Sequence, residues 1–574
     1  MERTPPLPDA PGSDRSRRAG IVLAMLVAAP RLAILFASPD VHLSLLVDDA
    51  SYYLEAARRT VEAGVWPTMD GRNPTNGFHP LYMGLLVLLQ RVAGTEPRLI
   101  VPLVMGLHLA LNGIAAWILG RLALRHAPGI PGWSAAILLA LDPGWLAHGT
   151  LGVENSLSSL LLLVLVLRWD ARFGDPVRAR ERPTGAWADG LLLGFAMLAR
   201  TDAAIWGLVL ITGGLWRSGW RDPDARRRAL ATGFVAFLVV VPWLIASIAR
   251  FGTIVQDSSA ALSARYQIEY GARFSIGSIR TGATQVGFWV YRMLWAGGLV
   301  PLTGWVLGRA FAPGSERPRN ASWGGWITAA LCALTLFLRA NDPTDIRDVR
   351  SAGIELLCGA AALAVGLASG PPAGFRRRPA LLMVLVATTL LVTAYAFVFR
   401  GFQVWYSTGP CLAFALFVFA CTAGPALAGR RQLTGVLVGL MAIQSVLVVG
   451  GLRSRGGIEG MHPGLVSEGA ALRERLTDRV ANQPFRVGSF DSGEVSYLLH
   501  PFPITNLDGV MNHHASLAVR NRRFADYLKK DGITHILGSA GRVEQFRRVS
   551  PFDVSPDSAW SEALGTEVWK VEGR

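Results

Sequence analysis

Long apolar stretches recur along most of this chain of 574 residues, and they constrain its fold more than any other feature. Hydrophobic residues make up 51% of the sequence and charged residues only 17%, which is typical of a membrane protein. A helix that crosses a bilayer needs roughly 20 apolar residues. We therefore expect an α-helical polytopic membrane protein with about thirteen spans. The candidates are residues 20–38, 99–120, 132–149, 155–168, 189–199, 203–215, 229–250, 284–307, 323–339, 351–369, 380–399, 409–427 and 433–452.

Basic residues, almost all of them arginine, fall in short clusters between these stretches. This pattern is typical of cytoplasmic loops, so the net charge of +15 does not indicate a nucleic-acid partner. If the clusters share the cytoplasmic side with the N-terminal tail, residues 1–19, the loops between them face outward. The clusters are residues 168–182, 217–228, 309–319, 376–378 and 430–431.

The Arg-rich clusters all lie on the cytoplasmic side only if the apolar run from Phe78 to Ala93 does not cross the membrane. We therefore expect residues 78–93 to form a helix in the outer leaflet, and residues 50–63 to form a second helix there. The alternative, in which 78–93 spans the bilayer, would place some Arg-rich loops outside.

The character of the chain changes after Gly451. Residues 453–574 are polar and alternate strand and helix signals, which predicts a small α/β domain. After thirteen spans this domain lies outside, beyond a transmembrane domain of residues 20–452. Arginine-rich composition favours a bacterial source, and hence the plasma membrane.

Two adjacent aspartates, Asp48 and Asp49, follow the first span in "VDDASYYLEAARRTVEAG". One aspartate before a helix would cap its free N–H groups. A second carboxylate beside it, near a membrane surface, needs a further reason. The other outward loops also carry polar groups, and such groups at membrane depth are expensive and functional by default. These segments are "DGRNPTNGFHPLY" (70–82), "GVENSL" (152–157), "LARTD" (198–202), "ARFGTIVQDSSA" (249–260) and "RGFQVWYSTGP" (400–410).

This ordered set resembles the GT-C superfamily of membrane glycosyltransferases over about residues 20–430. The nearest likeness is to relatives of the protein mannosyltransferases, the lipid A aminoarabinose transferase and the mycobacterial arabinofuranosyltransferases. The resemblance implies a polyprenyl-phosphate sugar donor and transfer with inversion on the outer face. It also implies a cell-envelope acceptor and a base role for the first acid, Asp48. An inverting transfer needs such a carboxylate to take the proton of the acceptor hydroxyl. Asp49 would bind the acceptor or support Asp48 without touching the substrate, and its like charge would raise one of the two pKa values.

The remaining candidates for donor or acceptor binding each have a structural alternative. Arg200 binds the donor phosphate or pairs with Asp202, and Glu154 orients the sugar or starts a helix. His79 donates to phosphate or is a structural histidine, and Asn76 belongs first to a turn. Trp405 and Tyr406 stack on sugar or isoprenoid, or form an interfacial aromatic belt. Arg265 and Arg400 complete the set, whereas a turn is the favoured role of Asp508.

Other chemistry has little support in the sequence. It contains no Gly-rich P-loop, no HExxH and no serine-nucleophile elbow. Cys332, Cys358, Cys411 and Cys421 lie in apolar stretches without metal-like spacing. We expect no cofactor, although a divalent metal is an open possibility. The alternative functions are a transporter or flippase of lipid-linked sugar, and a scaffold whose outer domain binds glycan. No internal repeat of the transporter kind is visible.

Overall fold

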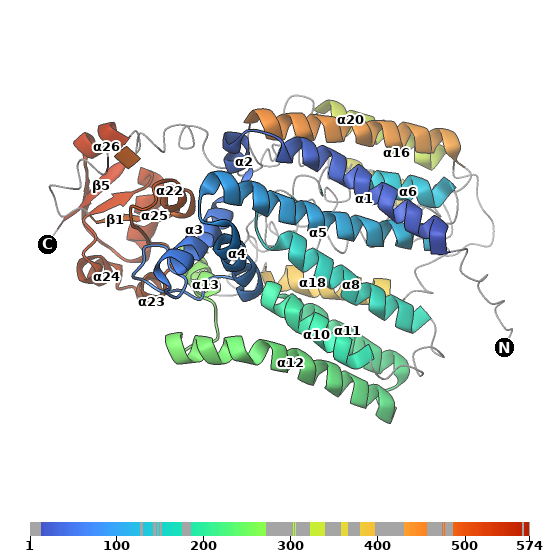
Figure 1. Ribbon diagram of the computed structural model, residues 1–574, viewed down its shortest axis with the longest axis horizontal. Coiled ribbons are helices and arrows are strands. Elements are labelled where there is room, and N and C mark those ends of the chain that lie inside the picture. Colours follow the sequence, from blue (N-terminus) through green and yellow to red (C-terminus); the bar gives the residue numbers. More distant parts are fainter. Residues whose placement is uncertain are drawn as a thin grey trace.

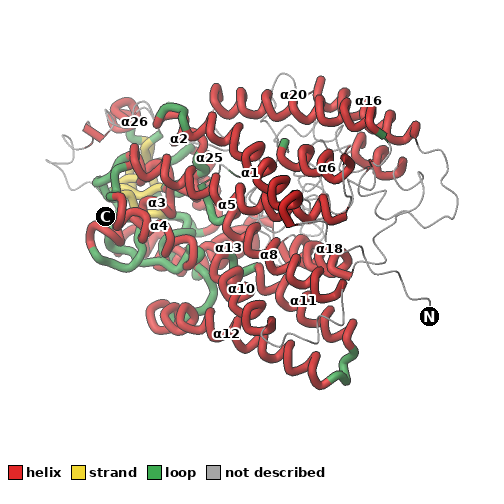
Figure 2. The backbone as a smooth tube through the Cα atoms, turned by 45° about the vertical axis from the view of Figure 1, so that its right-hand side comes forward, coloured by secondary structure: helices red, strands yellow, loops and turns green. Residues whose placement is uncertain are grey.

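The apolar stretches form helices that pack along one another, and the polar C-terminal segment stacks on one end of this bundle (Figures 1 and 2). The computed structural model describes residues 13–126, 130–141, 152–174, 185–270, 322–338, 357–365, 379–395, 430–455, 486–564 and 567–572, with residues 145, 149, 302, 305, 427, 473, 474 and 476. The N-terminal helices are α1 (Ser13–Leu35), α2 (Pro39–Leu45), α3 (Asp48–Ala63), α4 (Pro80–Ala93), α5 (Pro97–His126) and α6 (Ile130–Ala140). They are followed by α8 (Asn155–Gly174), α10 (Gly185–Ala199), α11 (Ala203–Ser218), α12 (Pro223–Phe251), α13 (Asp257–Tyr270), α16 (Ser322–Leu338), α18 (Pro379–Thr393) and α20 (Arg431–Arg455).

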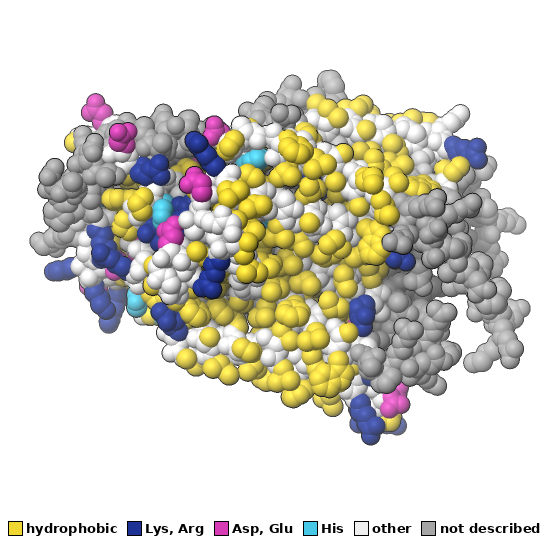
Figure 3. Space-filling view, in the orientation of Figure 1, with side chains coloured by type: hydrophobic (Ala, Val, Ile, Leu, Met, Phe, Trp, Pro, Cys, Tyr) yellow, Lys and Arg dark blue, Asp and Glu magenta, His cyan; other side chains and the backbone are white. Residues whose placement is uncertain are grey.

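Three helices in the described part of the chain are long and apolar enough to cross a membrane: Pro97–Leu124 of α5, Pro223–Phe251 of α12 and Arg431–Val449 of α20. A fourth span is formed if α1 and α2, which meet at 115°, count as one. Hydrophobic side chains cover the visible face of the bundle, whereas charged side chains gather over the C-terminal segment (Figure 3). The fold is therefore that of an integral membrane protein. Apart from residues 302, 305 and 427, the predicted spans 284–307 and 409–427 lie outside the described residues, so the count of thirteen stays a prediction.

Close packing within the bundle depends on small residues. Gly190 and Gly194 of α10 lie one turn apart against α12. A Cβ atom at either position would come within 2.6 Å of the Cβ of Val235 or Val239. Small residues four apart let two membrane helices approach closely. This contact aligns the end of α10 with the end of α12, where several site residues lie.

The short helices α3 and α4 pack against each other where the bundle meets the C-terminal segment (Figure 1). The 14 residues of α4 extend about 21 Å at 1.5 Å per residue, which is less than the roughly 30 Å of a bilayer core. The predicted helices at 50–63 and 78–93 are present as α3 and α4, and the length of α4 favours the expected non-spanning helix over the spanning alternative. Their depth in a bilayer stays a prediction.

Residues 486–572 form the predicted α/β unit. Its sheet has the order β2-β1-β3-β5-β4, with β1 parallel to both β2 and β3, and β5 antiparallel to β3 and β4. The strands are β1 (Val487–Ser489), β2 (Ile504–Asn506), β3 (His535–Leu537), β4 (Val554–Pro556) and β5 (Val568–Val571). The helices are α22 (Gly493–Leu498), α23 (His513–Arg520), α24 (Phe524–Asp531), α25 (Ala540–Val549) and α26 (Ser558–Leu564). Since α20 continues to Arg455, the predicted boundary at residue 453 falls inside its last turn.

Candidate active site

The two aspartates of α3 are each followed four residues later by a tyrosine, so Asp48 pairs with Tyr52 and Asp49 with Tyr53 along the helix. The two tyrosines face different parts of the protein. The Tyr52 hydroxyl accepts a hydrogen bond from Ser492 N of the α/β unit at 3.1 Å. The Tyr53 hydroxyl accepts one from His79 N beside the bundle at 3.0 Å. The first two turns of α3 thus connect two polar clusters.

Asp48 does not cap its own helix. The N-cap residue of α3 is Val47, which has no side-chain capping bond. Instead Asp48 Oδ1 accepts a hydrogen bond of 2.7 Å from Glu494 N, in the first turn of α22. The Tyr52 hydroxyl bonds to the same carboxylate. The capping interpretation is therefore wrong for α3, although Asp48 does satisfy the N-terminus of a helix from the other domain.

Burial raises the pKa of Asp48 from 3.8 to about 7, and the charges of Asp491 and Asp508 add to this rise. The Glu494 N–H group and Tyr52 act in the opposite direction, because they bond to the ionised form. Asp491 and Asp508 follow the carboxyl ends of β1 and β2. The sequence argument attributed the shift to Asp49, whereas the structure attributes it to burial and to acids of the α/β unit.

Asp508 combines two roles. Its Oδ1 atom accepts from Val510 N at 2.9 Å, as the predicted turn requires. Burial, and after it the charge of Asp491, raises the pKa of Asp508 to about 6, while Arg542 and Arg265 act to lower it. Arg265 lies in α13 and is 7% exposed. Asp508 and Arg265 therefore belong to the surroundings of Asp48.

A second cluster brings together the ends of several helices. Arg200 Nη1 lies 2.7 Å from Glu154 Oε1, and Arg200 Nη2 lies 2.8 Å from Asp202 Oδ2. His79 Nε2 lies 3.5 Å from the same oxygen of Glu154. Tyr395 donates to Asp202 Oδ2 at 2.7 Å. The structure therefore brings the candidates His79, Glu154, Arg200 and Asp202 together in one cluster.

The hydrogen bonds of Arg200 bear on its predicted role. Its Nε atom donates to Asp202, Nη1 to Glu154 and Asn155, and Nη2 to Asp202 and Tyr395. Every nitrogen of the guanidinium thus serves a protein acceptor. Although burial acts to raise it, the Arg200 charge holds the pKa of Asp202 below its usual value. The structure matches the pairing alternative, and contact with phosphate would require Arg200 to exchange a partner.

Burial lowers the pKa of His79 below its usual value, while the charge of Glu154 acts to raise it. Gln256 Nε2 donates to Phe78 O at 2.8 Å and lies 3.4 Å from His79 Nδ1. This network assigns the acceptor role to Nδ1 and the N–H group to Nε2, which faces Glu154. His79 is thus held in one orientation by Gln256 and Glu154.

Asn76 has a structural position. Its side chain donates to Ser247 Oγ at 2.8 Å and accepts from Asp257 N at 2.9 Å. Asp257 also bonds His513 of the α/β unit at 2.8 Å. The segment around Asn76 therefore links the bundle, α13 and the α/β unit. These contacts match the predicted turn role of Asn76 and not direct contact with a ligand.

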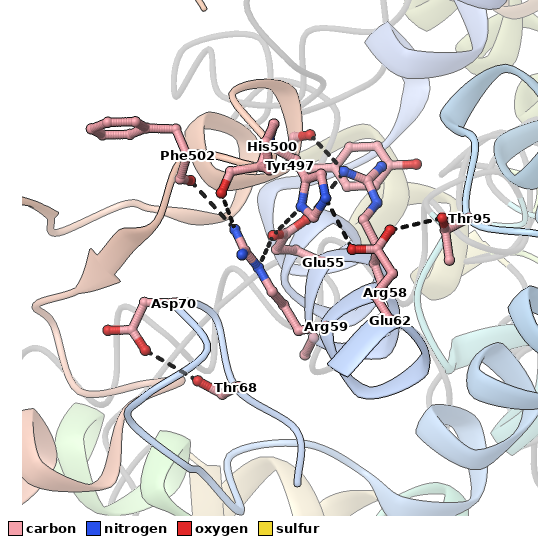
Figure 4. A network of polar contacts seen from close by, with 12 residues as sticks. Glu55, Arg58, Arg59, Glu62, Thr68, Asp70, Thr95, Tyr497, His500 and Phe502 are labelled. Carbon is pink, nitrogen blue, oxygen red and sulfur yellow. Dashed lines mark hydrogen bonds and ion pairs between the residues drawn. The ribbon is translucent and has the colours of Figure 1, made fainter. Parts of the chain in front are cut away.

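A further network joins α3 to α22 and to the residues after it (Figure 4). Glu55 Oε1 bonds Arg59 Nε at 2.7 Å and His500 Nδ1 at 3.0 Å. Arg59 also donates to Pro501 O at 3.2 Å, and Arg58 lies 4.5 Å from the centre of the Tyr497 ring. These contacts fix α3, and hence Asp48, against the α/β unit.

Several residues of the site were missed in the sequence. Tyr52, Tyr53, Gln256 and Asp491 stand in segments that were noted for other features, and Tyr395 carried no motif. Their roles depend on contacts between distant segments. The candidates Arg400, Trp405 and Tyr406 lie outside the described residues. Within the described part of the chain, no group of three or more His, Cys, Asp or Glu side chains is arranged to hold a metal ion.

Comparison with known proteins gives matches among solved structures. No family model matches the chain, and no curated protein matches it. ArnT from Cupriavidus metallidurans, bound to undecaprenyl phosphate, is 18% identical with a TM-score of 0.43, over 95% of this chain and 97% of that chain. The oligosaccharyltransferase AglB from Archaeoglobus fulgidus, in complex with an inhibitory peptide and a dolichol-phosphate, is 13% identical with a TM-score of 0.47, over 97% and 74%.

ArnT and AglB belong to the GT-C superfamily, whose motifs the sequence resembles. Since the backbones agree only loosely at these TM-scores, the function of this chain has to be argued from its own residues.

Proposed function

We propose that the protein is a glycosyltransferase that moves a sugar from a polyprenyl-phosphate donor to an acceptor hydroxyl, with Asp48 as general base. The observation that carries this proposal is the environment of Asp48. Its side chain is half-buried where α3 meets the α/β unit, is held by Glu494 N–H, and has its pKa raised to about 7. A general base works best when its pKa lies near the working pH.

The reaction balances with this one base. Asp48 takes the proton of the acceptor hydroxyl as its oxygen attacks the anomeric carbon of the donor sugar. A new carbon–oxygen bond forms, and the bond between the anomeric carbon and the phosphate oxygen breaks. The lipid phosphate leaves with the electron pair. Attack from the side opposite to the phosphate inverts the anomeric carbon.

The leaving phosphate needs positive charge or N–H donors near it. Arg200 already serves Glu154 and Asp202, so we assign the phosphate to Arg265 and to Arg400. The position of Arg265 supports this role, because Arg265 is close enough to Asp508 to affect the pKa of that carboxyl group. His79 and Asp49 are assigned to orientation of donor and acceptor, and Trp405 and Tyr406 to stacking on the sugar or the isoprenoid.

The membrane arrangement follows the same logic. We place α3, the α/β unit and the Glu154–Arg200–Asp202 cluster on the outer face of a bacterial plasma membrane, where a lipid phosphate presents its sugar. The donor sugar is a hexose or a pentose, and the acceptor is a hydroxyl of a cell-envelope glycan, lipid or protein. No metal ion is required in this proposal.

The test is transfer by the purified full-length protein in detergent or proteoliposomes. The protein is incubated with a panel of polyprenyl-phosphate hexoses and pentoses and with envelope acceptors, with and without EDTA. The proposal predicts a glycosylated product and free polyprenyl phosphate in equal amounts. Movement of intact lipid-linked sugar across proteoliposomes without product would favour the transporter instead. Failure of every donor to react or move would reject both.

A further inference from the structure

The α/β unit reaches Asp48 through one short loop, residues 490–494 between β1 and the first turn of α22. Glu494 N donates to Asp48 Oδ1 at 2.7 Å, across 446 positions of the chain. Ser492 N donates to the Tyr52 hydroxyl at 3.1 Å. Backbone N–H groups of the loop therefore contact both Asp48 and Tyr52, which lie one turn apart on α3.

Gly493 explains how the loop comes so close. A Cβ atom at this position would lie 2.3 Å from the main-chain oxygen of Asp48 and 2.7 Å from its Oδ1 atom. Real Cβ contacts do not reach such distances, and the oxygen at 2.3 Å belongs to rigid backbone. Gly493 does not have a left-handed backbone conformation, so its own φ angle does not demand glycine. Glycine is needed at position 493 because the backbone and carboxylate of Asp48 lie so close to it.

Tyr52 completes the contact. Its hydroxyl accepts from Ser492 N, and Asn506 Nδ2 lies 3.5 Å away. Since donors approach its oxygen, the hydroxyl proton is left for the Asp48 carboxylate, to which Tyr52 bonds. Asn506 Nδ2 also donates to Ser492 Oγ at 3.0 Å, which fixes the loop to the end of β2.

The docking of the unit is held elsewhere as well. A Cβ atom at Gly77 would lie 1.9 Å from Val510 O, so the bundle and the α/β unit also meet closely there. His513 N donates to Pro74 O at 3.2 Å, and Thr505 Oγ1 donates to Asp70 at 2.8 Å. The loop at Asp48 is therefore one part of an extended, close interface.

We propose that the loop 490–494 is a positioning element for the general base, so that Asp48 is competent only when the α/β unit is docked on α3. This inference rests on the proposed function for its catalytic meaning. The Glu494 N–H group fixes the rotation of the carboxylate, the Tyr52 hydroxyl bonds it as well, and Gly493 leaves room for the loop to approach. The α/β unit then supplies part of the active site instead of being an appendage.

The first test is Gly493→Ala, with Gly541→Ala as matched control. A Cβ atom at Gly541, in α25 of the same unit, meets nothing within 4 Å. A displacement of about 1 Å at a reacting group can cost about 10²-fold in rate. We expect Gly493→Ala to lower kcat by about 10- to 100-fold and to leave the donor KM within about twofold. Gly541→Ala should match wild type in both constants. Wild-type kcat in Gly493→Ala would overturn the proposal.

The second test is Tyr52→Phe, which keeps the ring and decides the matter if Gly493→Ala does not fold. Its control is Tyr527→Phe, which removes a buried hydroxyl that bonds Asn512 in the same unit. Loss of a hydrogen bond to an ionised carboxylate raises its pKa. We expect Tyr52→Phe to move the acid limb of the pH profile of kcat/KM upward by about one pH unit, and Tyr527→Phe to leave it in place. An unmoved limb in Tyr52→Phe would overturn the proposal.

A readout without turnover separates this inference from the proposed function. Infrared difference spectra follow protonation of the Asp48 carboxyl with pH, and Asp48→Asn provides the blank. A midpoint that rises in Tyr52→Phe but not in Tyr527→Phe supports the loop's role even if no donor of the panel reacts. Equal midpoints in both variants would contradict it, even if the wild type transfers sugar.

Discussion

Arg200 and Glu154 form a buried ion pair of 2.7 Å that joins the end of α10 to the start of α8, although 46 positions separate them in the chain. Their side chains are 1% and 5% exposed. Asp202 holds the other side of the guanidinium at 2.8 Å. Arg200 is thus shared between two carboxylates, Glu154 and Asp202, which lie at the ends of three helices. With one positive and two negative side chains, this group keeps a net negative charge.

This pairing predicts a large loss of stability in Arg200→Ala. Removal of one partner of a buried ion pair typically costs about 3–5 kcal/mol, because it leaves an uncompensated charge. Here two carboxylates would lose their partner. We expect a clearly lower thermal transition of the detergent-solubilised protein. Lys at position 200 keeps the charge but not the fork of donors, so Arg200→Lys should fall between Ala and wild type. Equal transitions in all three proteins would contradict the structural role.

Asn76 should affect stability more than turnover. Its amide bonds Ser247 and Asp257 in a buried position, and a buried group left unsatisfied costs about 1–3 kcal/mol. We expect Asn76→Ala to lower the thermal transition while kcat changes less than about threefold. A lower kcat with an unchanged thermal transition would instead indicate that Asn76 binds the donor or acceptor.

The topology predicts opposite accessibility at the two ends of the molecule. Arg227 and Lys530 are both exposed, the first at the start of α12 and the second in α24 of the α/β unit. We expect Lys530→Cys to react with an impermeant thiol reagent on intact cells, and Arg227→Cys to react only after permeabilisation. The unsubstituted protein serves as control for the native cysteines. Labelling of both positions from outside would contradict the proposed membrane topology.

Much of the helical fold could be predicted, because the apolar stretches and arginine clusters are local signals. The site was only partly predictable. Asp48, Glu154, Arg200 and Asp202 were singled out as candidates because charged residues at membrane depth are rare. The contact between Asp48 and Glu494 could not be found, because it depends on how the α/β unit docks and uses a backbone N–H group that any residue carries. Gly493 likewise looks like an ordinary loop glycine.

The raised pKa of Asp48 predicts how transfer depends on pH. A base must be deprotonated, so kcat/KM should rise with pH and level off above about pH 7. Stability should move in the opposite direction. A carboxylate whose pKa rises from 3.8 to about 7 on folding contributes stability at low pH that is lost as pH rises through about 7. Comparison of wild type with Asp48→Asn isolates both effects, and an acid limb near pH 4 would show an unperturbed base.

The role of Asp48 is the central claim, and Asp48→Asn tests it most directly. Asparagine can still accept from Glu494 N, so the interface of α3 and the α/β unit should persist, but it cannot take a proton. A general base contributes about 10²–10⁴-fold. Asp49→Asn, next to it on α3, is the matched control and should cost less.

The decisive measurement is kcat of purified Asp48→Asn in the transfer assay, made beside its thermal transition and its affinity for the donor. We predict a loss of about 10²–10⁴-fold in kcat, with a thermal transition and donor affinity close to wild type. Transfer by Asp48→Asn at near wild-type rate would contradict the account, because Asp48 would then only hold the first turn of α22.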